Sequence, residues 1–157
     1  MSSQPESRFE AWARSEGIEV SVRRFPEGTR TAEDAARAIG CEVAQIVKSL
    51  VFAVDGRPVL ALVSGANRLD MGRLAELAGG AVERADAAAV REATGYAIGG
   101  VPPFGHATQL RAWMDGTLLG FDVVWAAAGR PDAVFPIAPE RLRELSRAAV
   151  ADLAEGG

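Results

Sequence analysis

Two apolar segments separated by a short turn place the strongest constraint on how this 157-residue chain folds. The first, IVKSLVFAV, spans positions 46–54, the second, VLALVSG, spans positions 59–65, and DGRP lies between them. Both segments are rich in β-branched and aliphatic residues, and an Asp-Gly pair favours the tight turn of a β-hairpin. The sequence therefore predicts an antiparallel hairpin whose first strand is central and covered on both faces.

The remaining elements mix helices and strands without a regular βαβ alternation. Capping residues predict several helix starts, because Thr31, Asp70 and Asp86 each precede an apolar helical pattern. We expect helices over residues 5–15, 32–40, 71–80, 85–95 and 139–155, and further strands over residues 18–25, 118–129 and 133–139. This pattern predicts an α/β domain of the mixed α+β type: one mixed central β-sheet or a partly closed barrel, surrounded by helices.

Composition limits the classes of function that are open to the chain. Hydrophobic residues make up 48% of the sequence, enough for a single domain over residues 1–157 with a full core. No apolar run approaches the ~20 residues of a membrane-spanning helix, and the N-terminus shows no secretion signal. The net charge of −4 disfavours a protein that coats nucleic-acid phosphates. We therefore expect a cytoplasmic protein that binds neither membranes nor DNA, with at most a small, local contact to RNA.

Lys48 is unusual in both its kind and its place. Of the 17 basic residues, 16 are arginine, and this single lysine lies within the first apolar strand. Alternation places Lys48 on one face of the strand and Ser49 on the other. A buried ammonium is costly unless it meets an anion or reaches water. Three explanations remain open: the lysine extends to solvent from the strand end, pairs with a carboxylate, or awaits an anionic ligand.

A loop rich in glycine and proline is the second unusual segment. The sequence GYAIGGVPPFGH spans positions 95–106 and contains Gly99, Gly100, Val101, Pro102 and Pro103 in succession. The glycines permit close approach of a ligand, and the prolines stiffen the chain. Such a loop suits ligand binding, although a rigid structural turn is an equal alternative. A Cβ at position 100 is expected to intrude where the loop would approach a substrate.

Together, in this order, the two segments resemble the YbaK/prolyl-tRNA synthetase-associated editing-domain family. The lysine-bearing strand, the hairpin and the segment Gly65–Asp70 resemble one half of the family pattern, and Gly99–Pro103 resembles its G-x-x-x-P loop. The stretch VVWAAAGRPDAVFPIAPERL is similar to its final strands and helix. The resemblance covers about residues 30–150.

This resemblance implies a freestanding aminoacyl-tRNA deacylase, an enzyme that hydrolyses the ester of a small mischarged amino acid on tRNA, with tRNA(Pro) as the expected substrate. It implies no cofactor, metal or covalent nucleophile. Lys48 would hold the phosphate or ribose at the tRNA 3′ acceptor end, while Gly99 and Gly100 would act on the ester carbonyl and the attacking water. Val101, Pro102 and Pro103 would complete the substrate site, and an aminoacyl-tRNA synthetase is a further expected partner.

His106 and Cys41 define the competing hypotheses. His106 is the single histidine and directly follows the loop, so it could contact substrate, act as a general base or simply pack there. A thiol hydrolase that pairs Cys41 with His106 is the minor alternative, because a cysteine beside apolar positions usually acts as a small hydrophobic residue. One histidine and one cysteine are too few for a zinc site. A non-catalytic module that binds an aminoacyl group, a nucleotide or a small anion is the other class of function considered.

Overall fold

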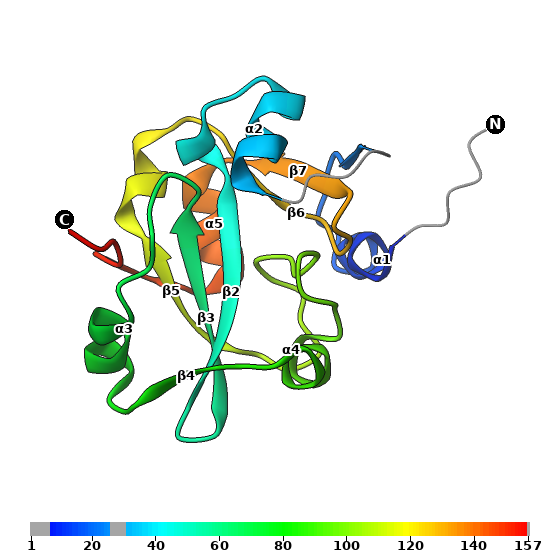
Figure 1. Ribbon diagram of the computed structural model, residues 1–157. Coiled ribbons are helices and arrows are strands. Elements are labelled where there is room, and N and C mark those ends of the chain that lie inside the picture. The colour runs from blue at the N-terminus through cyan, green and yellow to red at the C-terminus, as the bar shows by residue number, and fades with distance from the viewer. Residues whose placement is uncertain (1–6, 26–30, 157) are drawn as a thin grey trace.

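The predicted hairpin forms the centre of the larger of two β-sheets (Figure 1). In the computed structural model, which describes residues 7–25 and 31–156, β2 (Val47–Val54) pairs antiparallel with β3 (Arg57–Ser64) along its whole length. Asp55 and Gly56 occupy the turn with φ of 51° and 79°. These are the left-handed values that a two-residue turn of this kind requires. The hairpin prediction is confirmed.

The strands form two separate sheets. The larger has the order β4-β2-β3-β5-β8, in which β4 (Val82–Arg84) pairs antiparallel with β2, whereas β5 (Arg111–Asp115) and β8 (Ala149–Ala151) extend the sheet in parallel. The smaller, antiparallel sheet has the order β1-β7-β6 and contains β1 (Arg23–Arg24), β7 (Ala133–Ile137) and β6 (Val124–Ala127). The mixed-sheet prediction is confirmed, and within the described residues the strands do not close into a barrel.

Short helices surround these sheets, and their ends follow the capping signals. They are α1 (Arg8–Ser15), α2 (Ala32–Ile39), α3 (Met71–Ala78), α4 (Ala87–Thr94) and α5 (Pro139–Ser146), with 3₁₀ turns η1 (Val43–Gln45) and η2 (Gly116–Gly120). The side chains of Thr31, Asp70 and Asp86 each accept a backbone N–H from the first turn of α2, α3 and α4. None of the helices in these two described ranges is long and apolar enough to cross a membrane.

Several predicted boundaries were wrong. The expected strand over 18–25 is reduced to Arg23–Arg24, because β7 pairs only with these two residues. The expected helix over 139–155 ends at Ser146, where Arg147 takes a left-handed φ of 59°, and the chain then forms β8 against β5. The segment 118–129 contains part of η2 before β6 begins. Residues 5 and 6 of the first predicted helix lie outside the described residues.

The two faces of β2 belong to different cores. Leu50 and Phe52 pack with α3 in a cluster that includes Leu74 and Trp113. Val47 and the residues that alternate with it face a larger cluster formed by α1, α4, the loop 95–106 and the smaller sheet. Figure 1 shows α3 and α4 on opposite sides of the hairpin. Lys48 and Ser49, which follow each other in β2, therefore point into different environments.

Strand β2 lies between β4 and β3 in the larger sheet, as predicted for a central strand, but its outer edge is only partly paired. Strand β4 covers this edge at Phe52–Val54 alone, and at the other end an isolated parallel bridge joins Ile46 to Trp125. Between these two points, no strand of the described residues pairs with the outer edge of β2. Strands β2 and β6 thus meet at one end and separate, which leaves room for a cavity between them.

Candidate functional site

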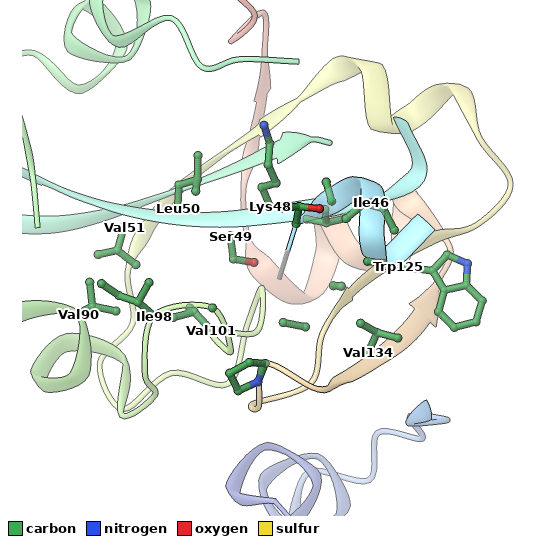
Figure 2. Close-up of a pocket in the computed structure, with 18 of the residues that line it drawn as sticks. Ile46, Lys48, Ser49, Leu50, Val51, Val90, Ile98, Val101, Trp125 and Val134 are labelled. Atoms are coloured by element: carbon green, nitrogen blue, oxygen red, sulfur yellow. The ribbon is translucent and has the colours of Figure 1, made fainter. Parts of the chain in front are cut away.

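A cavity of about 510 Å³ lies where β2 and β6 separate (Figure 2). Its walls come from β2, the end of β4, the first turn of α2, Val90 of α4, the loop 95–106, and strands β6 and β7 with the turn that joins them. Three of the predicted site residues line it: Lys48, Gly99 and Val101. The volume falls in the range of small-molecule sites and exceeds that of one amino acid side chain. The fold therefore brings the two unusual sequence segments to one cavity.

The loop reaches this cavity on a firmly packed base. Ala97, Ile98 and Gly99 are exposed, whereas the five residues from Gly100 to Phe104 are buried. The ring of Phe104 lies 5.5 Å from that of Phe9 and 5.8 Å from that of Phe135, measured between centroids. Such aromatic contacts fix a loop more firmly than backbone stiffness alone. The loop thus presents an exposed tip at Gly99 above an anchored segment.

The two glycines at the tip serve different purposes. Gly99 has a φ of 91°, and a Cβ there would find its nearest neighbour, Pro131, at 3.8 Å. At Gly100, a Cβ would lie 2.9 Å from the Cα of Arg130. Gly100 is therefore required where the loop crosses the backbone of the β6–β7 turn, and not, as the sequence suggested, where the loop approaches a substrate.

Pro102, Pro103 and His106 do not line this cavity. The carbonyl of Pro102 accepts a hydrogen bond from Nε2 of His106 at 2.6 Å, which places the ring proton on that nitrogen because a carbonyl can only accept. Burial lowers the pKa of His106, and the bond to Pro102 partly opposes this. His106 lies in a smaller cavity of about 130 Å³, beside Trp12. His106 thus supports the loop from outside the larger cavity.

Cys41 lies in a different part of the molecule. It packs against the cluster formed by Ala35, Ala36 and Ile46 at α2, and burial raises the pKa of its thiol. A raised pKa disfavours the thiolate that nucleophilic catalysis requires. His106, by contrast, belongs to the small cavity beside α1. The arrangement gives no support to a Cys/His hydrolase.

The ammonium of Lys48 lies on the α3 face of β2. Its Nζ donates to the backbone carbonyl of Asn67 at 2.5 Å. Burial lowers the pKa of Lys48, nearby Glu33 and Asp115 raise it, and Arg68 lowers it slightly further. The Asn67 amide in turn donates to Asp115 at 2.8 Å. The segment that follows β3 thus holds the Lys48 ammonium near the N-terminal end of β2. The ammonium has further N–H donors that an anion could accept.

Ser49 carries a buried polar group that the sequence reasoning did not single out. Figure 2 shows its side chain on the side of β2 opposite to Lys48, the side on which Val101 and Val134 also lie. Its Oγ is buried and has no hydrogen-bond partner within the described residues. Alternation along β2 contained a usable signal, because Ser49 is the one polar residue on a face otherwise formed by Val47, Val51 and Ala53.

Comparison with known proteins places this site in a family. Residues 26–145 match the family model of the aminoacyl-tRNA editing domain. The chain belongs to this family, as the resemblance of the lysine strand and the glycine-proline loop indicated.

In the parts of the chain that the structure describes, no group of three His, Cys, Asp or Glu side chains could hold a metal ion.

Individual relatives agree with this assignment. A solved structure described as a putative trans-editing enzyme for prolyl tRNA synthetase is 49% identical, with a TM-score of 0.93 over 99% of this chain and 100% of that one. The uncharacterized protein YwhH of Bacillus subtilis is 32% identical over 89% of this chain and 87% of its own length. The putative Cys-tRNA(Pro)/Cys-tRNA(Cys) deacylase EbsC of Enterococcus faecalis is 28% identical over 82% of this chain and 80% of its own.

Proposed function

We propose that this protein is a trans-editing aminoacyl-tRNA deacylase, which hydrolyses the ester of a small mischarged amino acid on tRNA, with tRNA(Pro) as its substrate. The observation that carries the proposal is the meeting of Lys48, Gly99 and Val101 at one cavity in a chain of the editing-domain family. The similarity to a trans-editing enzyme for prolyl tRNA synthetase supports the choice of tRNA. A cytoplasmic location and an association with a synthetase follow from this role.

In the proposed reaction, the exposed tip of the loop acts on the ester. An aminoacyl ester is already activated, so orientation and oxyanion stabilisation are sufficient, and one backbone donor contributes a factor of about 10²–10³ in rate. Gly99, at the cavity wall, supplies such a donor, and Gly100 holds the peptide plane against Arg130. Water attacks the carbonyl, and the 2′-hydroxyl of the terminal ribose assists it. The products are the free amino acid and uncharged tRNA.

Lys48 has the role of an anion anchor. Its ammonium lies at the end of β2 with one donor directed to Asn67, and the terminal phosphate or ribose of the tRNA would receive the others. Val101 forms part of the wall for the amino acid. Pro102, Pro103 and His106 act through the loop, since they lie behind the residues that line the cavity.

The test is incubation with tRNA(Pro) charged with a panel of small amino acids in the presence of EDTA, with loss of the ester followed over time. We expect hydrolysis of at least one ester, undiminished by the chelator and by Cys41→Ser. Binding without hydrolysis of any ester would favour the non-catalytic module instead. Activity that disappears with EDTA and returns with one metal ion would show that the chemistry differs from this proposal.

A further inference from the structure

Asp115, the last residue of β5, is a buried carboxylate to which the proposed reaction assigns no role. Its exposed fraction is 2%, and burying a carboxylate is costly unless hydrogen-bond donors surround it. Its Oδ2 accepts from the N–H of Ser64 at 3.1 Å and from the side-chain amide of Asn67 at 2.8 Å. Its Oδ1 accepts from the N–H of Thr117 at 3.0 Å, which caps η2. Two of the three bonds therefore join Asp115 to the turn 64–67 at the end of β3.

The turn 64–67 also holds the ammonium of Lys48. The N–H of Asn67 donates to the carbonyl of Ser64 at 3.0 Å and closes the turn. The carbonyl of Asn67 accepts from Nζ of Lys48 at 2.5 Å, while its side chain donates to Asp115. A single residue, Asn67, thus connects the buried carboxylate to the ammonium through hydrogen bonds on either side.

Charge links Asp115 to Lys48 as well. Burial lowers the pKa of Lys48, Glu33 and Asp115 raise it, and Arg68 lowers it. The two carboxylates differ in their surroundings: Glu33 is exposed on α2, whereas Asp115 is buried and bonded to the turn. Asp115 can therefore act on Lys48 through the position of the turn in addition to its charge.

We propose that Asp115 is a positioning residue, which fixes the turn 64–67 so that the carbonyl of Asn67 holds the Lys48 ammonium where an anionic group of the substrate meets it. This inference rests on the proposed function, in which Lys48 is the anion anchor. A lysine ammonium ends a flexible four-carbon stem and has no fixed orientation of its own. An acceptor held in place by a buried carboxylate orders it before the substrate arrives, which lowers the entropic cost of binding.

The first test compares two substitutions that each remove one negative charge near Lys48. Asp115→Asn keeps the shape of the side chain but replaces one oxygen by an NH2 group, so at least one of the three donors loses its acceptor. We expect kcat/KM for a mischarged tRNA(Pro) to fall by about tenfold or more. Glu33→Gln is the matched control: it leaves the bonds of Asp115 intact and should stay within about threefold of the wild type. Equal losses in the two variants would show that charge alone acts and would overturn the inference.

A second variant breaks the same connection from the other side. Asn67→Ala keeps the carbonyl that Lys48 binds and removes the amide that Asp115 holds. It tests the connection even if Asp115→Asn fails to fold, because Asn67 is only partly buried, and it should also lose about tenfold in kcat/KM. The double variant should lie within about threefold of either single one, since both changes remove one connection. Losses that multiply to about 100-fold would mean that the two residues act independently, against the proposal.

A spectroscopic measurement separates this inference from the proposed function. The chain has one lysine, so ¹³C-labelled lysine gives one Cε signal, which reports both the titration of Lys48 and its contact with adenosine 5′-monophosphate. In Asp115→Asn the pKa of Lys48 should be lower than in the wild type, because a carboxylate that raises it is gone. The affinity for adenosine 5′-monophosphate should fall by at least about threefold in Asp115→Asn and in Asn67→Ala.

The two proposals can then fail separately. If the wild-type protein cleaves no ester but both variants bind adenosine 5′-monophosphate more weakly, the positioning role of Asp115 stands and the hydrolase proposal falls. An unchanged affinity in both variants would refute the positioning role, whatever the outcome for hydrolysis.

Discussion

At the scale of single residues, the most informative pair is Lys48 and Ser49, which point to opposite sides of one strand. Lys48 is held by the carbonyl of Asn67, close enough to Glu33 and Asp115 to feel their charge. Among the described residues, the Ser49 hydroxyl has no such partner. Lys48 can therefore meet an anionic group of a substrate in the proposed reaction, whereas the Ser49 hydroxyl is shielded even from water.

Substitution of Lys48 tests its role as an anion anchor. Lys48→Met should reduce kcat/KM for a mischarged tRNA by about 30-fold or more, as loss of one member of a close charge pair does. Lys48→Arg should also fail, because a planar guanidinium cannot donate to Asn67 from the position of a compact ammonium. Since burial disfavours this cation, we expect the free energy of unfolding of Lys48→Met to stay within about 1 kcal/mol of the wild-type value. Retained hydrolysis by Lys48→Arg would show that any cation suffices.

Gly100 and Gly99 offer a matched pair for the loop. Gly100→Ala places a Cβ 2.9 Å from the Arg130 backbone, and overpacking of this kind costs about 1–3 kcal/mol and displaces the loop. Gly99→Ala has space for its Cβ but must hold a φ of 91°, which also costs about 1–2 kcal/mol. We therefore expect both variants to unfold at lower urea concentration, with the β6–β7 turn disturbed in NMR spectra of Gly100→Ala only. An unchanged turn in Gly100→Ala would contradict the packing explanation.

At the scale of elements, the loop 95–106 owes its position to what lies behind it. Phe104 fixes the loop in the aromatic core, and His106 donates to the carbonyl of Pro102. Ile98 and Gly99, at the exposed tip, and Val101 line the cavity where a ligand would bind. An anchored loop keeps its backbone donors in place before substrate arrives, which is the condition for oxyanion stabilisation without reorganisation.

The buried His106, which donates to the carbonyl of Pro102, predicts that stability depends on pH. Burial lowers the pKa of His106 in the folded protein, while in the unfolded chain it returns to about 6.5. Below that pH the unfolded chain binds a proton that the folded chain does not, so stability should fall as the pH drops from about 6.5, by at most about 1.4 kcal/mol per pH unit from this group. His106→Gln, whose amide can still donate to Pro102, should show a shallower decline in urea unfolding between pH 7 and pH 5. Parallel curves for the two proteins would exclude this role.

The same elements show what a sequence can predict. Local signals were reliable: the Asp-Gly turn located the hairpin, and Thr31, Asp70 and Asp86 located three helix starts. Strands β5 and β8 were missed because parallel pairing joins residues far apart in the chain and leaves no turn signature. The C-terminal segment also has a helical pattern, which tertiary pairing overrides after Ser146.

The site, too, could be predicted only where the signal is local in the sequence. Lys48 and the glycine-proline loop stand out by composition alone, and both reach the cavity. The free hydroxyl of Ser49 and the contact between Gly100 and Arg130 depend on neighbours brought together only by the fold. Packing of this kind has no local signature, so the sequence could mark the loop but not assign separate purposes to its glycines.

At the scale of the whole molecule, the cavity exists because two sheets share one junction and then separate. The bridge between Ile46 and Trp125 joins them, and β4 closes the far end of β2. This arrangement opens a cavity for the end of a substrate without requiring a long groove. It agrees with the net charge of −4, which leaves little electrostatic attraction for an extended stretch of RNA.

Salt dependence measures the size of the RNA contact. If only the acceptor end is bound, two or three phosphates are neutralised, and the plot of log affinity against log salt concentration should have a slope of about −2. Affinity for an uncleaved tRNA would be measured between about 50 and 200 mM salt, the range over which such slopes are resolved. A slope steeper than about −5 would indicate many phosphate contacts, and the small, local interface would then be wrong.

The measurement that bears most directly on the proposed function compares two esters of the same tRNA. tRNA(Pro) charged with a small noncognate amino acid and tRNA(Pro) charged with proline are incubated separately with the protein, and the remaining ester is followed against a buffer control. An editing deacylase should remove the noncognate amino acid and leave proline in place, since removal of proline would undo correct charging. Decay of both esters at the rate of the buffer control would contradict hydrolysis, and equal enzymatic decay of both would contradict editing.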